Sequence, residues 1–202
     1  RYYLCFDEWN VWYRARTVGD WDGKGKFAPH LVEEEYNLED GLVVAEFFNS
    51  FLRHADVLKI ANIAQIVNVI APILTRGDEM LLQTLYDVFV MYSSRRDGTS
   101  LLPVVEGPGY ESKSYGYVNT IDTSAILGED RLHVFLVNRS LKESARVEVQ
   151  AGGLPLKGLE SAEALYGKDP QALNTFEQPD LLRSRKLESV RVDTKKAVVT
   201  LP

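Results

Sequence analysis

The residues best suited to chemistry are two adjacent carboxylates, Asp7 and Glu8, which are followed at once by large aromatic side chains. Trp9, Trp12 and Tyr13 supply flat apolar rings, whereas the carboxylates supply hydrogen-bond acceptors. Sugars present apolar C–H faces together with many hydroxyl groups, so a carbohydrate site needs both kinds of side chain. An apolar run precedes Asp7, so Glu8 would stand at the carboxyl end of a strand, where barrel enzymes carry catalytic residues. The pattern predicts a carbohydrate site.

These residues also have a purely structural interpretation. Asp7 and Glu8 could cap the next element while Trp9 and Trp12 pack in the core. Exposed carboxylates at strand ends are common, so the residue types alone favour this second interpretation.

Three amide side chains, Asn62, Gln65 and Asn68, interrupt an otherwise apolar segment that we expect to form a buried strand. Buried amides must be hydrogen-bonded, so they either build an internal network or line a polar pocket. For Gln65 the two interpretations are equally open.

Composition excludes several classes of protein. The chain has 202 residues, of which 45% are hydrophobic, and a net charge of −6, so we expect a globular protein without a nucleic-acid partner. The longest apolar stretch is interrupted by Lys59 and three amides, which argues against a membrane span. A single cysteine and dispersed histidines (His30, His54, His133) argue against a metal site or cofactor. No signal peptide is visible, which favours a cytoplasmic location, and Arg1 looks like an internal residue of a longer protein.

The elements that must position the carboxylates follow an α/β rhythm up to residue 95. Asn37 followed by Asp40 resembles a capping box at the start of a helix. The predicted order is a strand over 2–6, a long irregular loop over 14–36, an amphipathic helix over 38–55, a buried strand within 57–69, a turn at 76–78 and a helix over 79–94.

From residue 96 onward the pattern changes to short alternating segments, which predict an all-β antiparallel sandwich. The segments are Tyr117–Thr123, Leu132–Asn138, Ala145–Gln150, Ser161–Tyr166, Val190–Asp193 and Ala197–Leu201. A long ordered loop is expected over 168–186. The chain is therefore predicted to have two domains, 1–95 and 96–202.

Two segments, Phe6–Tyr13 and Ala64–Ile73, resemble the α-L-arabinofuranosidases of glycoside hydrolase family 51. Glu106-Gly107-Pro108 and the strand Leu132–Arg139 also look like parts of that family's C-terminal β-sandwich. The resemblance implies that residues 1–95 form the last two strand–helix units of a (β/α)₈ TIM barrel. A jelly-roll-like antiparallel β-sandwich would then follow.

The resemblance also assigns roles to individual residues. Glu8 matches the catalytic nucleophile, Trp12 a residue bordering the substrate site, and Gln65 a glutamine that hydrogen-bonds the arabinofuranose. The acid/base glutamate is expected upstream of Arg1, in an N-terminal portion of the same enzyme. The implied function is a retaining hydrolase that releases terminal non-reducing α-L-arabinofuranosyl residues from arabinose-containing hemicellulose or pectin. It needs no cofactor, and relatives commonly form homo-oligomers.

Two alternatives stay open. The sandwich could be a non-catalytic carbohydrate-binding or structural module, but Tyr117, Phe135 and Tyr166 are few and mostly in strands that look buried. The enzyme could also be an endoglucanase of the same family.

Overall fold

The computed structural model describes residues 2–13, 27 and 32–202 as a mostly β structure with two helices, α1 (Leu38–Arg53) and α2 (Thr84–Ser93). Most of the loop expected over 14–36, including His30, lies outside the described residues. The described strands are β1 (Leu4–Trp9), β2 (Leu58–Ile63), β3 (Ile73–Arg76), β4 (Glu79–Leu82), β5 (Thr99–Leu101), β6 (Gly109–Ser112), β7 (Gly116–Asn119), β8 (Ile121–Leu127), β9 (Leu132–Asn138), β10 (Ala145–Gln150), β11 (Glu163–Ala164), β12 (Arg185–Lys186), β13 (Val190–Val192) and β14 (Lys196–Leu201). Neither described helix is long and apolar enough to cross a membrane.

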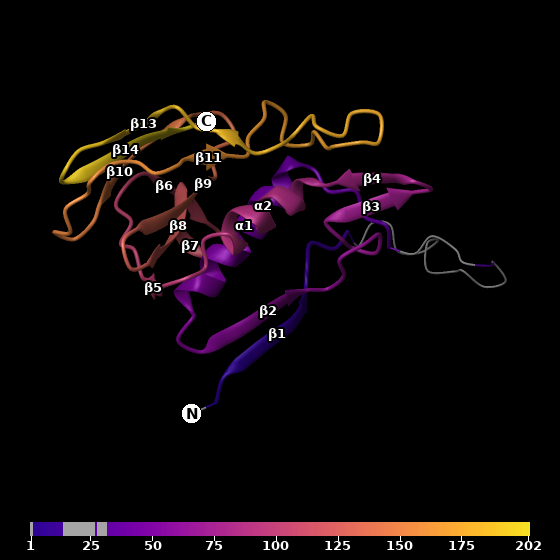
Figure 1. Cartoon of the computed structure of the whole chain (residues 1–202), viewed down its shortest axis with the longest axis horizontal. Coiled ribbons are helices and arrows are strands. Elements are labelled where there is room, and N and C mark those ends of the chain that lie inside the picture. The colour runs from indigo at the N-terminus through magenta and orange to yellow at the C-terminus, as the bar shows by residue number, and fades with distance from the viewer. Residues whose placement is uncertain (1, 14–26, 28–31) are drawn as a thin grey trace.

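The first part of the chain is a β–α–β unit. β1 and β2 pair in parallel, with Leu4 opposite Leu58, and α1 connects them (Figure 1). Parallel strands are ordinarily covered on both faces, yet Leu4, Phe6 and Ile60 are exposed here. The expectation that both strands are buried is wrong for this chain, because β1 and β2 form a sheet of only two strands.

Both strand boundaries differ from the prediction. β1 runs on through Asp7 and Glu8 to Trp9 instead of ending before the carboxylates. β2 ends at Ile63, so Gln65 lies beyond the strand and not within it. Propensity placed the strands correctly, but only tertiary pairing decides where they end.

Helix α1 begins where the sequence predicts. Asn37 Oδ1 accepts a hydrogen bond from Asp40 N at 3.0 Å, and Asn37 N donates to Asp40 Oδ2 at 2.9 Å, which completes the capping box. The helix then continues to Arg53. The predicted helix over 38–55 is confirmed to within two residues.

The predicted helix over 79–94 is only partly correct. Residues 79–82 form β4, which pairs with β3 across a two-residue turn that begins with Gly77 at φ 59°. Glycine at that position suits a tight hairpin, because other residues rarely adopt positive φ. The helix begins at Thr84, just after the buried Gln83. The Gln83 side chain accepts a hydrogen bond from Tyr36 N at 2.7 Å and donates one to Ala71 O at 2.7 Å.

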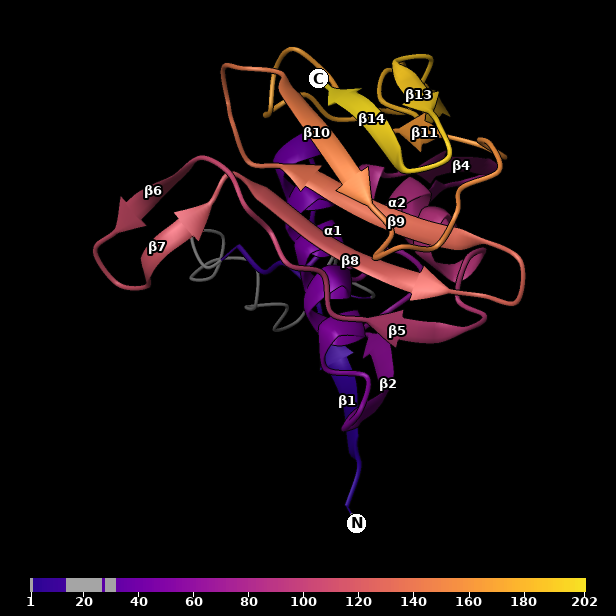
Figure 2. The same ribbon diagram turned by 90° about the vertical axis from the view of Figure 1, so that its left-hand side faces the viewer.

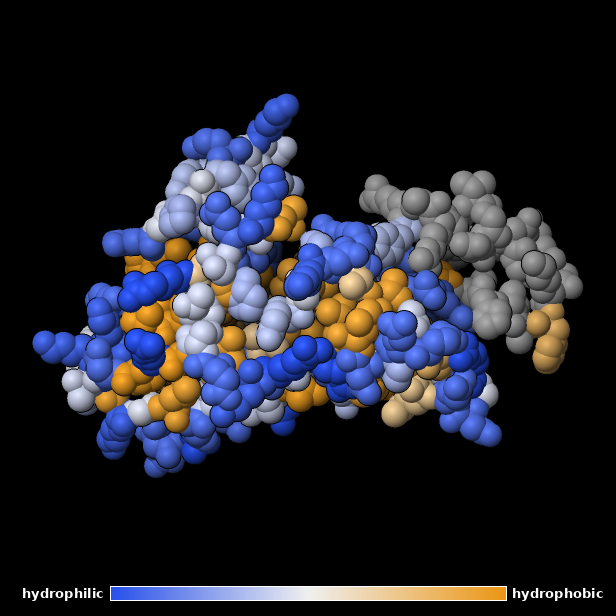
Figure 3. Space-filling model, turned by 90° about the horizontal axis from the view of Figure 1, so that it is seen from above, coloured by the Kyte–Doolittle hydropathy of each residue, from blue (hydrophilic) through white to orange (hydrophobic). Residues whose placement is uncertain are grey.

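The second part of the chain contains two three-stranded antiparallel sheets, β5–β8–β9 and β10–β14–β13. The first sheet lies against α1. The second sheet covers the face of the first sheet that points away from α1 (Figures 1 and 2). Strands β6 and β7 form a separate hairpin that projects from the body (Figure 2). From above, hydrophobic residues surface only in patches among hydrophilic ones (Figure 3).

The long segment 168–186 is largely irregular, as predicted, and partly buried polar contacts attach it to α2. Arg183 forms two hydrogen bonds to Asp87, at 2.9 and 3.0 Å, and Ser184 N donates to the same carboxylate at 2.6 Å. A bidentate guanidinium–carboxylate pair fixes both distance and orientation. The segment is thereby held in one place on the helix.

The hydrophobic core joins the two parts. Tyr92 of α2 stacks on Phe135 of β9, with ring centroids 4.1 Å apart and planes at 11°. Trp9, Val44 and Ile126 belong to the same buried cluster, so β1, α1 and β8 share one core. Because one core spans both parts, the division into domains 1–95 and 96–202 stays a prediction.

A polar network crosses the same junction, centred on Asp122 of β8. Its carboxylate accepts hydrogen bonds from Asn49 at 2.8 Å and from Arg53 at 3.0 Å, and it pairs with Arg139 at 3.3 Å. Asn49, which is fully buried, also accepts from Ser124 at 2.6 Å. The network therefore fixes α1 in register on the sheet.

We predict that Asp122→Ala lowers the free energy of unfolding by about 3–5 kcal/mol, because two guanidinium groups and a buried amide lose their common partner. Urea denaturation measures the change. Glu188→Ala, at the exposed Lys186–Glu188 pair, is the control and should leave the midpoint unchanged. A loss below about 1 kcal/mol for Asp122→Ala would mean that the network does not fix the helix on the sheet.

Candidate active site

Trp9 anchors the candidate site to the core. Its ring is only 4% exposed and has four phenylalanine neighbours with centroids 5.0 to 5.8 Å away. These neighbours are Phe47, Phe48, Phe51 and Phe89. Aromatic pairs at this spacing are favourable beyond the area that they bury, so the end of β1 is firmly held against α1 and α2.

The next residues are attached by hydrogen bonds. Asn10 Nδ2 donates to Ile70 O at 2.5 Å, while its Oδ1 accepts from Val11 N at 2.8 Å. Val11 O accepts from the buried Tyr36 hydroxyl at 2.8 Å. The backbone after the strand is thus fixed on two sides.

Tyr13 closes this anchored segment by donating a hydrogen bond from its hydroxyl to Asp40 Oδ1. Burial raises the pKa of the Tyr13 phenol, and the hydrogen bond to Asp40 raises it further. Burial likewise raises the pKa of the Asp40 carboxyl, although the hydrogen bonds from Tyr13 and Asn37 oppose this effect. The phenol therefore stays protonated and acts as a donor.

Glu8 and Trp12 are the residues of the segment that face solvent together with Asp7. Glu8 is exposed and Trp12 is 50% exposed, in contrast to the buried Trp9 between them. The structural interpretation, with both tryptophans in the core, is right for Trp9 and wrong for Trp12. A carboxylate and an accessible indole ring are available for a ligand.

Gln65 lies just after β2, and its side chain is exposed, as is that of Asn62. The interpretation as a buried internal network is wrong for Asn62 and Gln65, because both side chains are exposed. Asn68 does have a structural role, at the surface: its Oδ1 accepts a hydrogen bond from Thr75 N at 2.8 Å, and its Nδ2 donates to Thr75 Oγ1 at 3.0 Å. Gln65 therefore stays available for a ligand.

The loop that carries Gln65 has an unusual backbone. Asn68 and Ile70 adopt positive φ angles of 63° and 41°. Asparagine tolerates this region better than most residues, but for the β-branched Ile70 it is an outlier. Such strain persists only where surrounding contacts enforce it. Here Ile70 N donates to Val32 O at 2.9 Å, and Asn10 bonds the Ile70 carbonyl.

The Glu8 and Gln65 segments are joined directly. Ala64 N donates to Trp9 O at 3.0 Å, next to the Asn10–Ile70 contact. The residues that follow both parallel strands therefore meet at one edge of the sheet. Sequence reasoning overlooked Asn10, although its place beside Glu8 and Trp9 in the recognised motif was a usable signal.

Within the described part of the chain, no group of three or more histidine, cysteine, aspartate or glutamate side chains is arranged to hold a metal ion. His54 stands at the C-terminal end of α1, and its Nδ1 contacts Ser50 O at 2.8 Å. His133 lies in β9, where burial and the nearby Arg95 lower its pKa. These two histidines thus lie in different elements and are not brought together.

Comparison with known proteins identifies the family. The profile of the α-L-arabinofuranosidase C-terminal domain matches residues 7–202. An intracellular exo-α-(1→5)-L-arabinofuranosidase of Streptomyces lividans is 37% identical over 184 residues, which are 88% of this chain and 27% of that protein. An exo-α-(1→6)-L-arabinofuranosidase of Bifidobacterium longum is 34% identical over 99% of this chain and 40% of its own length.

Solved structures agree with these matches. A family 51 α-L-arabinofuranosidase from Bifidobacterium longum superimposes with a TM-score of 0.87 at 30% identity, over 99% of this chain and 40% of that one. The family 51 arabinofuranosidase from Xanthomonas axonopodis gives 0.84 at 34% identity, over 99% and 39%. The chain thus spans well under half the length of these relatives. It belongs to the α-L-arabinofuranosidases of glycoside hydrolase family 51 and corresponds to their C-terminal portion.

Proposed function

We propose that this chain supplies the nucleophile, Glu8, of a retaining α-L-arabinofuranosidase. The observation that carries the proposal is the contrast between neighbours: Trp9 is locked in the core, whereas Glu8 is exposed beside the loop that carries Gln65. A nucleophile needs such a rigid support together with access to substrate. Trp12 would border the sugar and Gln65 would bond its hydroxyl groups.

The chemistry proposed is a double displacement. A Glu8 oxygen attacks the anomeric carbon while the glycosidic C–O bond breaks, and an acid/base glutamate gives its proton to the leaving oxygen. Water, deprotonated by that same glutamate, then attacks the ester and restores Glu8. The two carboxyl groups of a retaining enzyme stand about 5 to 5.5 Å apart.

The acid/base glutamate is proposed to come from an N-terminal portion of the enzyme. Asp7 is a poor candidate, because adjacent residues on a strand tend to point to opposite faces. The exposed parallel pair β1–β2, with α1 between its strands, supports the idea that both strands belong to a (β/α)₈ barrel completed by that portion. A jelly-roll-like sandwich over 96–202 and a homo-oligomer belong to the same proposal.

The proposed substrate is a terminal α-L-arabinofuranosyl residue on hemicellulose or pectin. Relatives named exo-α-(1→5)- and exo-α-(1→6)-L-arabinofuranosidase support this class over a β-glucan. Several of them are named intracellular, which supports a cytoplasmic location and a role in arabinan catabolism.

We predict that Glu8→Ala in the full-length enzyme abolishes turnover without loss of folding, because the covalent nucleophile is removed from an exposed position. Azide should restore cleavage of an activated aryl arabinofuranoside and give a glycosyl azide of inverted configuration, identified by NMR. Asp7→Ala is the matched control: its activity should follow the folded fraction and should not respond to azide. If azide rescues Asp7→Ala, or if Glu8→Ala keeps a near-normal kcat, the nucleophile is misassigned.

We also predict that Gln65→Ala lowers kcat/KM by roughly 10- to 100-fold, about 1.4 to 2.8 kcal/mol, because hydrogen bonds that strengthen toward the transition state are lost. The melting temperature should change little, since the side chain is exposed. Gln178→Ala, at another exposed glutamine, should leave both quantities unchanged. A collapse of the melting temperature with normal activity per folded molecule would make Gln65 structural.

A further inference from the structure

A second candidate site lies in the sheet part of the chain. An open cavity of about 330 Å³ is bordered by the end of α1, the segment before β6 and the strands β7 and β8. Its lining includes Arg53, Tyr117, Asn119, Asp122 and Arg139. Small-molecule sites span about 300–1,000 Å³, so this open cavity lies at the lower end of the range and has room for about one sugar unit.

Tyr117 is a preorganised aromatic surface at this cavity. The side chain is 57% exposed, which corrects the expectation that the tyrosines of the sandwich are buried. Its hydroxyl donates to Gly107 O at 3.1 Å, and its ring lies so close to Gly109 that an added Cβ there would stand 2.7 Å from Cζ. Both contacts hold the hydroxyl end of the ring, and a ring fixed in this way loses less conformational freedom when a ligand binds.

Other tyrosines of the chain are also exposed, although the register pairs Tyr110 with Val118 and so places it on the other face of the hairpin from Tyr117. Tyr110 and Tyr115 lie on the same projecting hairpin and are exposed by 52% and 85% (Figure 2). Tyr166, in another part of the chain, is exposed as well. The expectation that Tyr117, Phe135 and Tyr166 lie mostly in buried strands is therefore wrong for the two tyrosines and right for Phe135.

Polar groups at the cavity can bond hydroxyls without attracting ions. Arg53 and Arg139 are balanced by Asp122 and Glu46, with which they pair. Arg53 uses only Nη1 in its hydrogen bonds to described residues, and the Asn119 amide uses neither of its polar atoms. The site thus has unused hydrogen-bond donors and acceptors, while its opposite charges cancel. Such a site suits hydroxyl groups better than a phosphate or a carboxylate.

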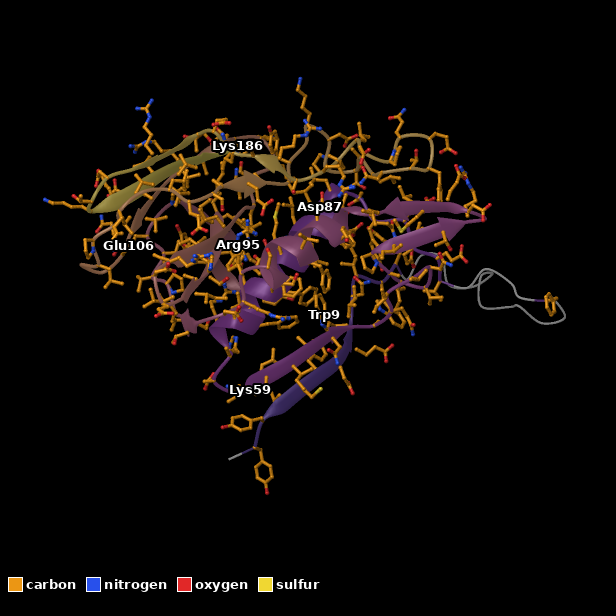
Figure 4. All side chains as sticks on the ribbon, in the orientation of Figure 1. Trp9, Lys59, Asp87, Arg95, Glu106 and Lys186 are labelled. Atoms are coloured by element: carbon orange, nitrogen blue, oxygen red, sulfur yellow. The ribbon has the colours of Figure 1, made fainter. Side chains whose placement is uncertain are left out.

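We propose that this cavity binds a neutral sugar unit of a polysaccharide chain, with its C–H face on Tyr117 and its hydroxyls on Arg53 and Asn119. This function goes beyond hydrolysis at Glu8 and does not depend on it. The cavity also lies elsewhere: Glu106, close before the hairpin, is well separated from Trp9 in the side-chain view (Figure 4). Such a site would hold the polymer while the chain end is processed.

The test is affinity electrophoresis of the full-length enzyme, with Glu8→Ala as the parent, in gels that contain linear arabinan. We expect retardation of the parent, a roughly tenfold weaker apparent affinity for Tyr117→Ala, and near-parental affinity for Tyr117→Phe, which keeps the ring. Tyr166→Ala, at an exposed tyrosine outside the hairpin, is the control and should match the parent. Polygalacturonate serves as the anionic comparison and should retard the parent less.

Hydrolysis separates this proposal from that for Glu8. With Glu8 intact, Tyr117→Ala should cleave a small aryl arabinofuranoside at the normal rate but show a raised KM on arabinan. The proposal is overturned if Tyr117→Ala binds arabinan like the parent, if Tyr166→Ala weakens binding equally, or if polygalacturonate binds better than arabinan. Loss of aryl-substrate turnover in folded Tyr117→Ala would also overturn it.

Discussion

The burial of Trp9 is the constraint on which the arrangement of this chain depends. One indole ring brings β1, α1 and α2 into contact, through Phe47, Phe48 and Phe51 on one helix and Phe89 on the other. Since the Trp9 ring must point into the core, the backbone of the adjacent Glu8 is held in a fixed position. A hydrophobic contact, and not a polar one, thereby determines where the candidate nucleophile stands.

Helix α1 transmits this order to the sheet part of the chain by two different kinds of interaction. Its aromatic residues pack around Trp9, whereas Asn49 and Arg53 bond Asp122. Apolar packing is tolerant of small shifts, but a network of buried hydrogen bonds permits one register. The combination keeps the β1–β2 unit and the antiparallel sheets in a single relative position.

The sequence predicted elements whose signals are local. Asn37 and Asp40 correctly predicted the start of α1, because a capping box is defined within four consecutive residues. The start of α2 was missed, because Leu82 pairs in a hairpin while Gln83 bonds distant backbone, which no periodicity reports. Residue types pointed to Glu8, Trp12 and Gln65, and the roles given to them come from the family resemblance and stay predictions. The exposure of Tyr117 depends on a hairpin that only tertiary structure defines.

Asp40 has a consequence for how this chain can change in evolution. One of its oxygens completes the cap with Asn37, and the other accepts the hydroxyl of Tyr13. Substitutions at positions 13, 37 and 40 should therefore be epistatic, since each removes a partner on which the others rely. We therefore expect the residues at these three positions to be substituted together in evolution and not one at a time.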